Sequence, residues 1–500
     1  MLYNSTRGRE GGFTSAMAIA GGLAMDGGLF VPEEAPPLPA DAIDVMAPMR
    51  YEERAEYVLR PFLDDFGGDE LGRFTREAYA SGKFDAHGAA PVRHLAEKDY
   101  FLELWHGPTC AFKDMALQIL PRLMTASLRK TGDGRDVCVL VATSGDTGKA
   151  ALEGFRDVER TKIMVFYPHG GVSEIQRLQM TTQEGGNVLV AAVDGNFDDA
   201  QTGVKLIFSD AGFRERLNAS GMFLSSANSI NWGRLAPQIA YYVSAYCDLA
   251  NDGNIKPGER VNFCVPTGNF GNILAGYYAK KMGLPIAKLI CASNRNDVLT
   301  QFINTGVYDR NREFFTTTSP SMDILVSSNL ERLLYELSNR DGGAVAGYMD
   351  ALAREGRYAV GGAMRELIAD SFECGSCADA DAGRAIADIF NMYDYLIDPH
   401  TAVAYEVLTR YRERTGDAAP TVVVSTASPY KFCGSVLNAL GRGVSDDGPG
   451  LIDALNAATG TEAPEPLSEL RGKRERFTRT VPRGDMLSAV EGFCQLTINN

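Results

Sequence analysis

The sequence predicts an α/β fold with two parallel-sheet α/β domains and a helical N-terminal subdomain. Two sets of short apolar runs support this prediction, because helix-compatible segments separate the runs, as in βαβ units. The first set covers residues 137–143, 162–168, 187–193 and 222–228. The second set covers residues 260–266, 287–293 and 421–427. A chain of 500 residues is also too long for one compact core, so we expect two or three domains.

The predicted elements fall into domains in chain order. Residues 1–95 place apolar residues at helical spacing in segments such as YEERAEYVLRPFLDDF, which predicts a mostly helical subdomain. Residues 96–130 include the strand pattern DYFLELW, and we expect them to join residues 227–500 in a large α/β domain. Residues 131–226 then form a small α/β domain. Within the large domain, residues 328–415 are predicted to be largely helical.

The composition argues against two classes of partner. The net charge is −15 and the pI is about 5.0, whereas nucleic acids and anionic membranes require a basic face. A small anionic substrate needs only a local positive site. No apolar stretch has the length of a membrane span, and MLYNSTRGREGG lacks the apolar core of a signal peptide. The nine cysteines are scattered, mostly inside apolar runs, so we expect a cytoplasmic protein with buried thiols.

One pair of cysteines has the spacing of metal ligands. Cys374 and Cys377 form the sequence CGSC, but no second pair or neighbouring histidines complete a zinc site. A loop before a helix is the better interpretation of this segment, and we expect no metal.

A single lysine stands in an unusual setting. In HGPTCAFKDMALQ, Lys113 follows Phe112 shortly after an apolar strand pattern, and the residues behind it read as the start of a helix. A surface lysine needs no such setting. A lysine that must lose its proton, or must bind a carbonyl compound, does need one.

Two loops have the strand–turn–helix pattern of anion sites. VATSGDTGKAA leaves several backbone N–H groups free at the start of a helix. It fails as a P-loop, because Thr143 replaces the required Gly and Ala150 replaces the required Ser or Thr. VPTGNFGNILAG is Gly-rich, and its amides from Gly268 to Asn272 could surround a phosphate. It is not GxGxxG, so a phosphate carried by an organic cofactor suits it better than a dinucleotide.

Two further strand ends carry polar side chains. SSANSINWGRL contains Asn228, Ser229 and Arg234, and arginine in such company usually binds phosphate or carboxylate. Taken alone, however, the segment is better explained as a helix cap followed by a surface arginine. STASPYKF places Thr426 at the end of the last buried run. Its hydroxyl could cap the next turn or face a neutral ring nitrogen. Together with Lys113 and the Gly-rich loop, these features suit pyridoxal phosphate, which lysine anchors as a Schiff base.

Taken in order, the motifs resemble those of the threonine synthase family. They run from residue 4 to beyond residue 430 and comprise STRG, LAMDGGLFVPE, LWHGPTCAFKDMALQ, TSGDTGKAA, SANSINWGRL, PTGNFGNILAG, DPHTAVA and STASPYKF. Any one of them is shared with other pyridoxal phosphate enzymes of the tryptophan-synthase-β fold type. The helical stretch after residue 328 is similar to that of the larger, bacterial and fungal type of the family.

The resemblance implies a reaction and a role for each motif residue. The reaction converts O-phospho-L-homoserine and water into L-threonine and phosphate, with pyridoxal 5′-phosphate as cofactor. Lys113 would be the Schiff-base lysine and the acid–base group, with Phe112 beside it. The other cofactor-binding residues would be Gly268, Asn269, Phe270, Gly271 and Asn272 at the phosphate, Thr426 at the ring nitrogen and Asp146 at the 3′-oxygen. The substrate-binding residues would be Thr143, Ser144, Thr147, Asn228, Ser229 and Arg234.

Other functions remain open on the same residues. A Ser/Thr dehydratase, or a phospho-lyase acting on O-phosphohomoserine or O-phosphothreonine, would use the same lysine, Gly-rich loop and hydroxyl. A catalytically silent binding protein is disfavoured because Lys113 is retained. As partners we expect only the small substrate, with no nucleic acid and no membrane, in a monomer or homodimer.

Overall fold

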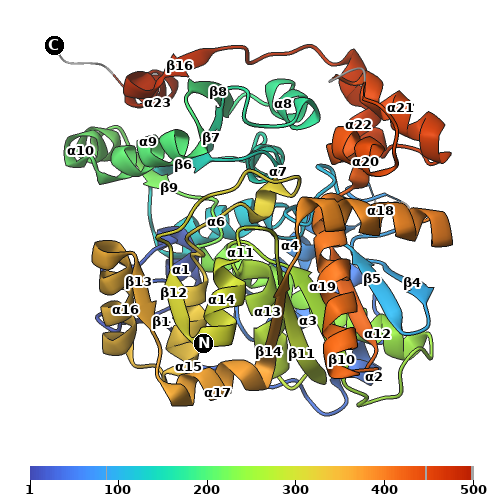
Figure 1. The fold of residues 1–500 in the computed structure, drawn as a ribbon. Coiled ribbons are helices and arrows are strands. Elements are labelled where there is room, and N and C mark those ends of the chain that lie inside the picture. Colours follow the sequence, from blue (N-terminus) through green and yellow to red (C-terminus); the bar gives the residue numbers. More distant parts are fainter. Residues whose placement is uncertain (81, 86, 445–447, 497–500) are drawn as a thin grey trace.

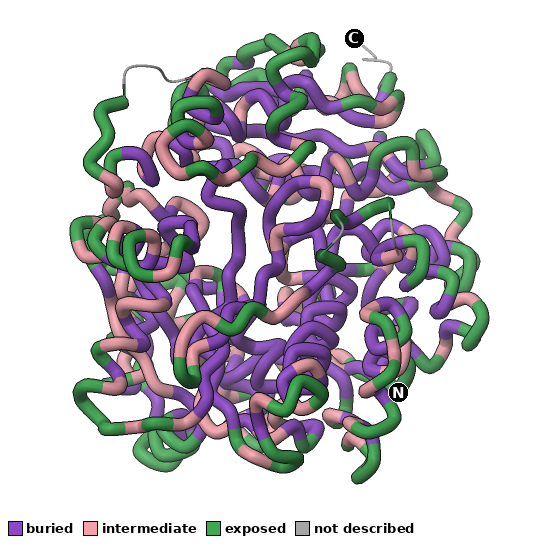
Figure 2. Tube along the Cα trace, turned by 90° about the vertical axis from the view of Figure 1, so that its right-hand side faces the viewer, coloured by how far each residue is buried: buried purple, intermediate pink, exposed green. Residues whose placement is uncertain are grey.

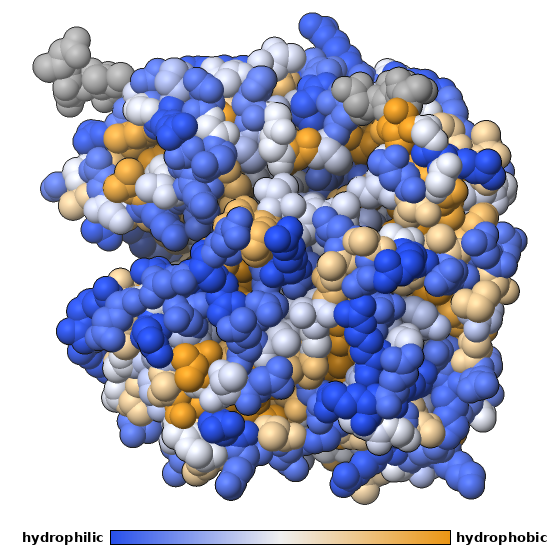
Figure 3. All heavy atoms as spheres, viewed as in Figure 1, coloured by the Kyte–Doolittle hydropathy of each residue, from blue (hydrophilic) through white to orange (hydrophobic). Residues whose placement is uncertain are grey.

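The computed structural model describes residues 1–80, 82–85, 87–444 and 448–496. Two α/β units lie one above the other, each built on its own parallel sheet (Figure 1). The predicted fold class is therefore confirmed. In the space-filling view, the surface is hollowed between the upper and lower halves at the left edge (Figure 3).

The larger unit contains a six-stranded sheet with the strand order β14-β11-β10-β15-β5-β4. Its strands are β4 (Val92–Ala96), β5 (Asp99–Glu103), β10 (Val261–Pro266), β11 (Ile286–Ser293), β14 (Phe372–Ser376) and β15 (Thr421–Ser425). All neighbours are parallel except β4 and β5. Strands β10, β15 and β5 are therefore adjacent, and their carboxyl ends meet at one edge of the sheet.

The smaller unit contains a five-stranded sheet with the order β16-β8-β7-β6-β9, in which every pair is parallel. Its strands are β6 (Asp136–Ala142), β7 (Thr161–Pro168), β8 (Val188–Asp194), β9 (Met222–Ser225) and β16 (Thr480–Pro482). Alternate residues of β6 pack on opposite faces: Val137 and Val139 in one core, Cys138 and Leu140 in another. Because both faces are buried, the strand reads as a continuous apolar run.

Helices cover both sheets and connect their strands (Figure 1). The smaller unit has α7 (Asp146–Phe155), α8 (Glu174–Thr181), α9 (Phe197–Ser209) and α10 (Ala211–Ala219). The larger unit has α5 (Asp114–Leu117), α6 (Leu120–Lys130), α11 (Trp232–Leu235), α12 (Pro237–Asn251), α13 (Gly271–Lys281), α14 (Val298–Thr305), α15 (Leu330–Leu337), α16 (Gly342–Glu355), α17 (Gly362–Ser371), α18 (Asp379–Tyr393), α19 (Pro399–Thr415) and α20 (Cys433–Ala439). No helix in the described part of the chain is both long and apolar enough to cross a membrane.

The N-terminal part combines helices with a small sheet that the sequence did not reveal. Its helices are α1 (Ser15–Gly21), α2 (Ala42–Met46), α3 (Tyr51–Leu59) and α4 (Gly68–Tyr79). Its strands β1 (Tyr3–Ser5), β2 (Gly11–Phe13) and β3 (Phe30–Pro32) form an antiparallel sheet of three-residue strands. Strands this short show no alternating pattern. The side chains of this part join the core of the larger unit, as the packing of Tyr3 on Trp232 shows, with ring centroids 5.6 Å apart.

Three short strands correct the sequence prediction within residues 227–500, and one of them, β13 (Arg357–Ala359), lies in the stretch predicted to be largely helical. Strand β14 lies in the stretch predicted to be largely helical, and Cys374 belongs to it rather than to a loop. Strand β16, with α23 (Met486–Cys494), belongs to the smaller unit and not to the larger one. The Cys494 and Cys138 sulfur atoms lie 3.6 Å apart. Val481 is the one buried residue of β16, so this strand has no apolar run from which it could be predicted.

The C-terminal segment crosses from one unit to the other. It leaves the larger unit after α20, forms α21 (Gly450–Thr459) and α22 (Glu465–Ser468), and then runs to β16 and α23 over the smaller sheet (Figure 1). Figure 2 shows the buried backbone passing through both units, with most exposed segments on the outside.

Gly154 provides a test of how the units pack. A Cβ at this position of α7 would lie 2.0 Å from the Leu117 carbonyl oxygen, just behind the lysine loop. We expect Gly154→Ala to destabilise the protein by about 1–3 kcal/mol, because the backbone must move apart. Gly347→Ala in α16 is the control, since its added Cβ meets nothing within 4 Å and should stabilise by up to about 1 kcal/mol. Thermal unfolding midpoints measure both, and equal midpoints would contradict the close contact.

Candidate active site

Three neighbouring strands of the larger sheet bring the predicted cofactor residues to one edge. Strand β5 leads into the Lys113 loop, β15 ends just before Thr426, and β10 leads into the Gly-rich loop. The order β10-β15-β5 makes these loops neighbours. Ligands bind at this edge in parallel α/β sheets.

The Lys113 loop is fixed at both ends. The Phe112 N–H donates to the Thr426 carbonyl oxygen at 2.8 Å, which ties the loop to the end of β15. The buried Asp114 carboxylate accepts hydrogen bonds from the Thr109 N–H at 2.8 Å and the Thr109 hydroxyl at 2.7 Å. Burial raises the pKa of Asp114 to about 6, although the bonds from Thr109 oppose the rise. Lys113 then immediately precedes α5.

The Lys113 amine lies in a dry setting beside one carboxylate. Its Nζ is 3.6 Å from Asp146 Oδ2 and 3.4 Å from Ser321 Oγ. The Nζ also lies 4.6 Å from the centre of the Phe112 ring. Burial lowers the pKa of Lys113 to about 8, and the Asp146 charge opposes part of that change. The amine can therefore lose its proton near neutral pH.

Asp146 begins α7 and stands between two ammonium groups. Its Oδ1 lies 3.1 Å from Lys431 Nζ and accepts a hydrogen bond from Gln176 Nε2 at 2.9 Å. Burial would raise the pKa of this carboxyl, but the charges of Lys431 and Lys113 outweigh burial and hold the pKa far below its usual range. Asp146 is therefore an anion at all physiological pH values.

The Gly-rich loop has the shape of a phosphate cradle. Phe270 adopts a left-handed conformation with φ of 61°, directly before α13 begins. The first N–H groups of a helix have no acceptor within the helix, so they are free to bind an anion. Asn272 Oδ1 accepts from the hydroxyls of Tyr241 and Tyr242. Its buried Nδ2 has no hydrogen-bond partner in the described chain, so the residues present fit a phosphate-bearing cofactor.

Residues on either side of this loop hold its shape. Ser327 Oγ donates to the Gly268 carbonyl at 2.8 Å, and the Asn329 side chain donates to the Asn269 carbonyl at 3.0 Å. A Cβ on Gly268 would lie 2.7 Å from the Ser321 carbonyl oxygen, so glycine is required there.

The second predicted anion site lies at the start of α7 in the smaller unit. The Thr143 hydroxyl accepts hydrogen bonds from the Gly145 and Gly148 N–H groups, both at 3.0 Å, and so shapes the turn. Its own O–H remains available to donate. Ser144 and Thr147 are half-buried on the same turn.

The segment after β9, a strand that neighbours β6, contributes the remaining residues. Arg234 is buried, not on the surface, and donates to the Ala227 carbonyl. Burial lowers the pKa of this guanidinium to about 10. The binding of an anion beside it would therefore be favourable, because the anion would stabilise the buried positive charge. Ser229 lies against the Gly-rich loop: a Cβ added to Gly271 would be 3.7 Å from the Cβ of Ser229. Asn228 is half-buried beside it.

Several site residues escaped the sequence interpretation. Ser321 joins Lys113 to Asp146, donating to Asp146 Oδ2 at 3.3 Å. The Ser321 N–H donates to His400 Nε2 at 3.2 Å. Lys431 and His400 lie inside the motifs STASPYKF and DPHTAVA, but nothing in the spacing of those motifs points at Asp146. Ser321 follows no strand and carried no signal.

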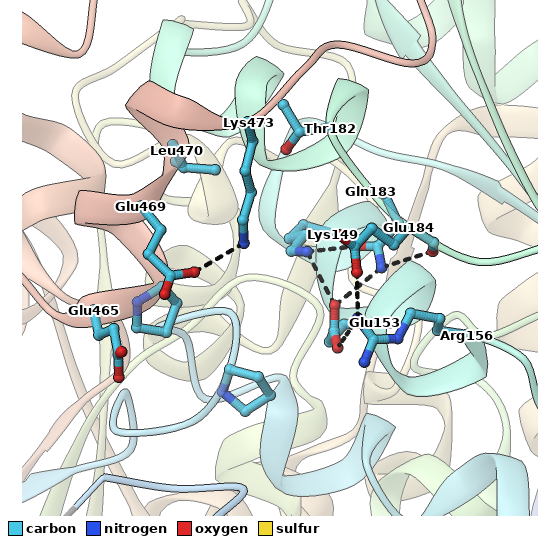
Figure 4. A pocket seen from close by; sticks show the side chains of 12 residues that line it. Lys149, Glu153, Arg156, Thr182, Gln183, Glu184, Glu465, Glu469, Leu470 and Lys473 are labelled. Carbon is cyan, nitrogen blue, oxygen red and sulfur yellow. Dashed lines mark hydrogen bonds and ion pairs between the residues drawn. The ribbon is translucent and has the colours of Figure 1, made fainter.

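A separate cavity of about 300 Å³ lies away from Lys113, between α7, α8 and the α22 segment (Figure 4). Several of its charged side chains pair with one another. Lys149 contacts Glu153 at 3.2 Å and donates to Gln183, and Lys473 lies 3.2 Å from Glu469.

Three family models together match most of the chain. The model described as threonine synthase N terminus matches residues 2–79. The model described as pyridoxal-phosphate dependent enzyme matches residues 84–427. The model described as threonine synthase, C-terminal matches residues 401–493.

Individual relatives agree with these models. Threonine synthase-like 1 of Homo sapiens is 42% identical over 85% of this chain, but the match spans only 57% of that longer relative. Threonine synthase of Pseudomonas aeruginosa is 42% identical over 86% of this chain and 89% of its own length.

Solved structures match the fold as a whole. Pyridoxal phosphate-bound threonine synthase from Brucella melitensis has a TM-score of 0.86 and 38% identity, covering 99% of both chains. The yeast threonine synthase has a TM-score of 0.87 and 33% identity, covering 99% of this chain and 98% of its own. The resemblance found in the motifs is thus confirmed. The chain belongs to the threonine synthase family of pyridoxal-phosphate dependent enzymes.

Proposed function

We propose that this protein converts O-phospho-L-homoserine and water into L-threonine and phosphate, as a carbon–oxygen lyase acting on a phosphate ester. One observation carries the proposal: two separate anion cradles flank the buried amine of Lys113. The cradle at α13 suits the phosphate of the cofactor. The cradle at α7, together with Arg234, suits the phosphate and carboxylate of a substrate. The free state of all nine cysteines agrees with a cytoplasmic location.

The residues proposed to hold the cofactor lie on the larger unit, except Asp146, which comes from the smaller one. The phosphate of pyridoxal phosphate would rest on residues 268–272, with Thr426 at the ring nitrogen and Asp146 at the 3′-oxygen. When bound at Lys113, the cofactor withdraws electrons and so makes carbon-bound protons of the substrate acidic. The neutral Thr426 hydroxyl accepts or donates a hydrogen bond without fixing a charge on the ring.

Lys113 is the group that moves protons. Its pKa of about 8 lets the amine take a proton from the substrate Cα and return protons at neighbouring carbons. Its position between Asp146 and Ser321 directs Nζ toward the space between the two units. Phosphate leaves from Cγ and water adds at Cβ. The same lysine serves each transfer, because Lys431, the other amine beside Asp146, is held by Thr109, Gln179 and Asp146.

The substrate-holding residues lie on the smaller unit and on α11. Ser144 and Thr147 offer hydroxyls, and Thr143 retains one O–H to donate. Asn228 and Ser229 supply further polar groups beside the Gly-rich loop. Arg234 can meet two oxygens of one phosphate or carboxylate at once.

The product identifies the reaction. We expect the purified holoenzyme to release L-threonine and phosphate in equal amounts from O-phospho-L-homoserine. Amino-acid analysis and a phosphate assay measure both. Release of 2-oxobutanoate in place of threonine would show instead a phospho-lyase or a dehydratase on the same fold.

The pKa of Lys113 predicts how cofactor uptake depends on pH. Only a neutral amine attacks the cofactor's aldehyde, so uptake by the cofactor-free protein should accelerate with pH through a midpoint near 8, the pKa of Lys113. The growth of the visible absorbance band measures the rate. Lys113→Arg should give no such band, because guanidinium stays protonated. A midpoint near the ordinary lysine value of about 10.4 would contradict the buried setting of the amine.

Arg234 should distinguish the two phosphate sites. We expect Arg234→Ala to raise the KM for O-phospho-L-homoserine by roughly ten- to a hundredfold, the worth of one or two charged hydrogen bonds. Arg234→Lys should still weaken binding, because it keeps the charge and loses the fork. Arg471→Ala is the control, since that exposed arginine pairs with Asp453 far from Lys113 in sequence. Loss of cofactor with an unchanged KM would mean that the two sites had been assigned the wrong way round.

A further inference from the structure

Lys431 is a lysine with no exposed surface. It lies in the 3₁₀ helix η2 (Pro429–Phe432), and its exposure is 0%. Its Nζ donates to the Thr109 carbonyl and to Gln179 Oε1, both at 2.8 Å, and lies 3.1 Å from Asp146 Oδ1. An ammonium group has three donors, and all three have partners. Burying such a charge is costly unless it is paired. Among the described residues, Asp146 is its only anionic partner, so the ion pair with Asp146 must offset the burial of Lys431.

The two oxygens of Asp146 have different surroundings. Oδ1 faces a fixed set, Lys431 and Gln176. Oδ2 faces Lys113 and Ser321, at 3.6 Å and 3.3 Å. One side of the carboxylate is thus permanently held, and the other side is turned toward the reacting amine.

The proposed reaction changes the charge on the Oδ2 side. Lys113 must be neutral to bind the cofactor or to take a proton, and it must move when the substrate replaces it. A buried carboxylate that depended on Lys113 alone would be left unpaired at those moments, which is strongly unfavourable. Asp146 would then take up a proton, and its position would be free to shift.

We propose that Lys431 is a positioning residue for this reaction: it is the permanent counter-ion that keeps Asp146 ionised and oriented while Lys113 changes charge and place. The inference rests on the proposed function, because it assumes that Lys113 is the reacting amine. It also assigns a purpose to helix α8, whose Gln176 and Gln179 hold Asp146 and Lys431 respectively.

Other charged groups around the carboxylate come from α11 and α19. Arg234 is close enough to lower the pKa of Lys113 through its charge, and His400 helps to lower that of Asp146. His400 Nε2 accepts the Ser321 N–H while Nδ1 lies 2.7 Å from Asp398 Oδ1. Lys431 is therefore the one cation in direct contact with Asp146 that the reaction leaves unchanged, among the described residues.

Removal of the Lys431 charge tests the proposal. Without it the pKa of Asp146 rises, and so does the pKa of Lys113, because Lys113 loses a repelling neighbour and becomes the sole partner of the carboxylate. Activity requires both groups deprotonated. In Lys431→Met holoenzyme the acidic limb of kcat/KM should therefore move to higher pH by about one unit. At neutral pH kcat should fall by about tenfold with a smaller change in KM.

A second readout needs no substrate. The visible absorbance of the bound cofactor should change with pH in Lys431→Met over the range in which its activity falls, whereas the wild-type spectrum should stay constant there. Lys431→Arg keeps the charge and should return the pH profile toward that of the wild type.

Lys149→Met is the matched control. Lys149 is also a largely buried lysine, and it forms an ion pair with Glu153 on the same helix as Asp146. In the described part of the chain it forms no ion pair with Asp146. Its loss should lower the unfolding midpoint and leave both the pH profile and the cofactor spectrum as they are. If Lys431→Met did the same, its role would be structural only and the proposal would be wrong.

A double variant keeps the test decisive if Lys431→Met folds poorly. Asp146→Asn/Lys431→Met removes both buried charges together. If Lys431 acts mainly through Asp146, adding Lys431→Met to Asp146→Asn should shift the pH profile and the spectrum much less than Lys431→Met does alone. An equal shift in the Asn background would overturn the proposal. Failure of the proposed function is seen separately, as absence of threonine from the wild-type assay, whereas the spectral titration does not involve substrate.

Discussion

The burial of one carboxylate is the constraint on which the site depends. Asp146 enters from the smaller unit, and the ammonium groups that balance it, Lys113 and Lys431, both come from the larger one. Because these charges are buried, the attraction between them is strong and constrains their separation. The relative placement of the two sheets is therefore coupled to the ionisation of the reacting amine. Ser321 and Gln176 complete the arrangement by satisfying the remaining lone pairs.

Much of the site could be predicted because parallel sheets obey a simple rule. Strand-end loops gather at one edge, so Lys113, Thr426 and the Gly-rich loop were expected to meet before the strand order was known. Lys431 could not be found in this way. A lysine in a polar stretch after a strand predicts a surface position, and its burial depends on Gln179 and Asp146, which are distant in sequence. The role of Lys431 therefore arises from the packing of the two units, and no local sequence pattern predicts it.

The elements that sequence periodicity missed share one property. Strands β14 and β16 and the N-terminal sheet are short, and each buries only one or a few side chains. Their place in a sheet is decided by the edge that is left open by longer strands. The bounds of the long strands β6, β7, β10 and β11 were predicted to within one or two residues. These strands are buried on both faces, so each has a continuous apolar run in the sequence.

The pairing of β16 with β8 has a consequence for how the protein is made. The smaller sheet is assembled from residues 136–225 and from residues 480–482, so it is discontinuous in the chain. During synthesis β8 remains an open edge, with unpaired backbone groups, while more than half of the chain is still being added. Such an edge can pair with another nascent copy. The smaller unit is thus completed only late in translation, and the ribosome-bound intermediate leaves this strand edge open to such pairing.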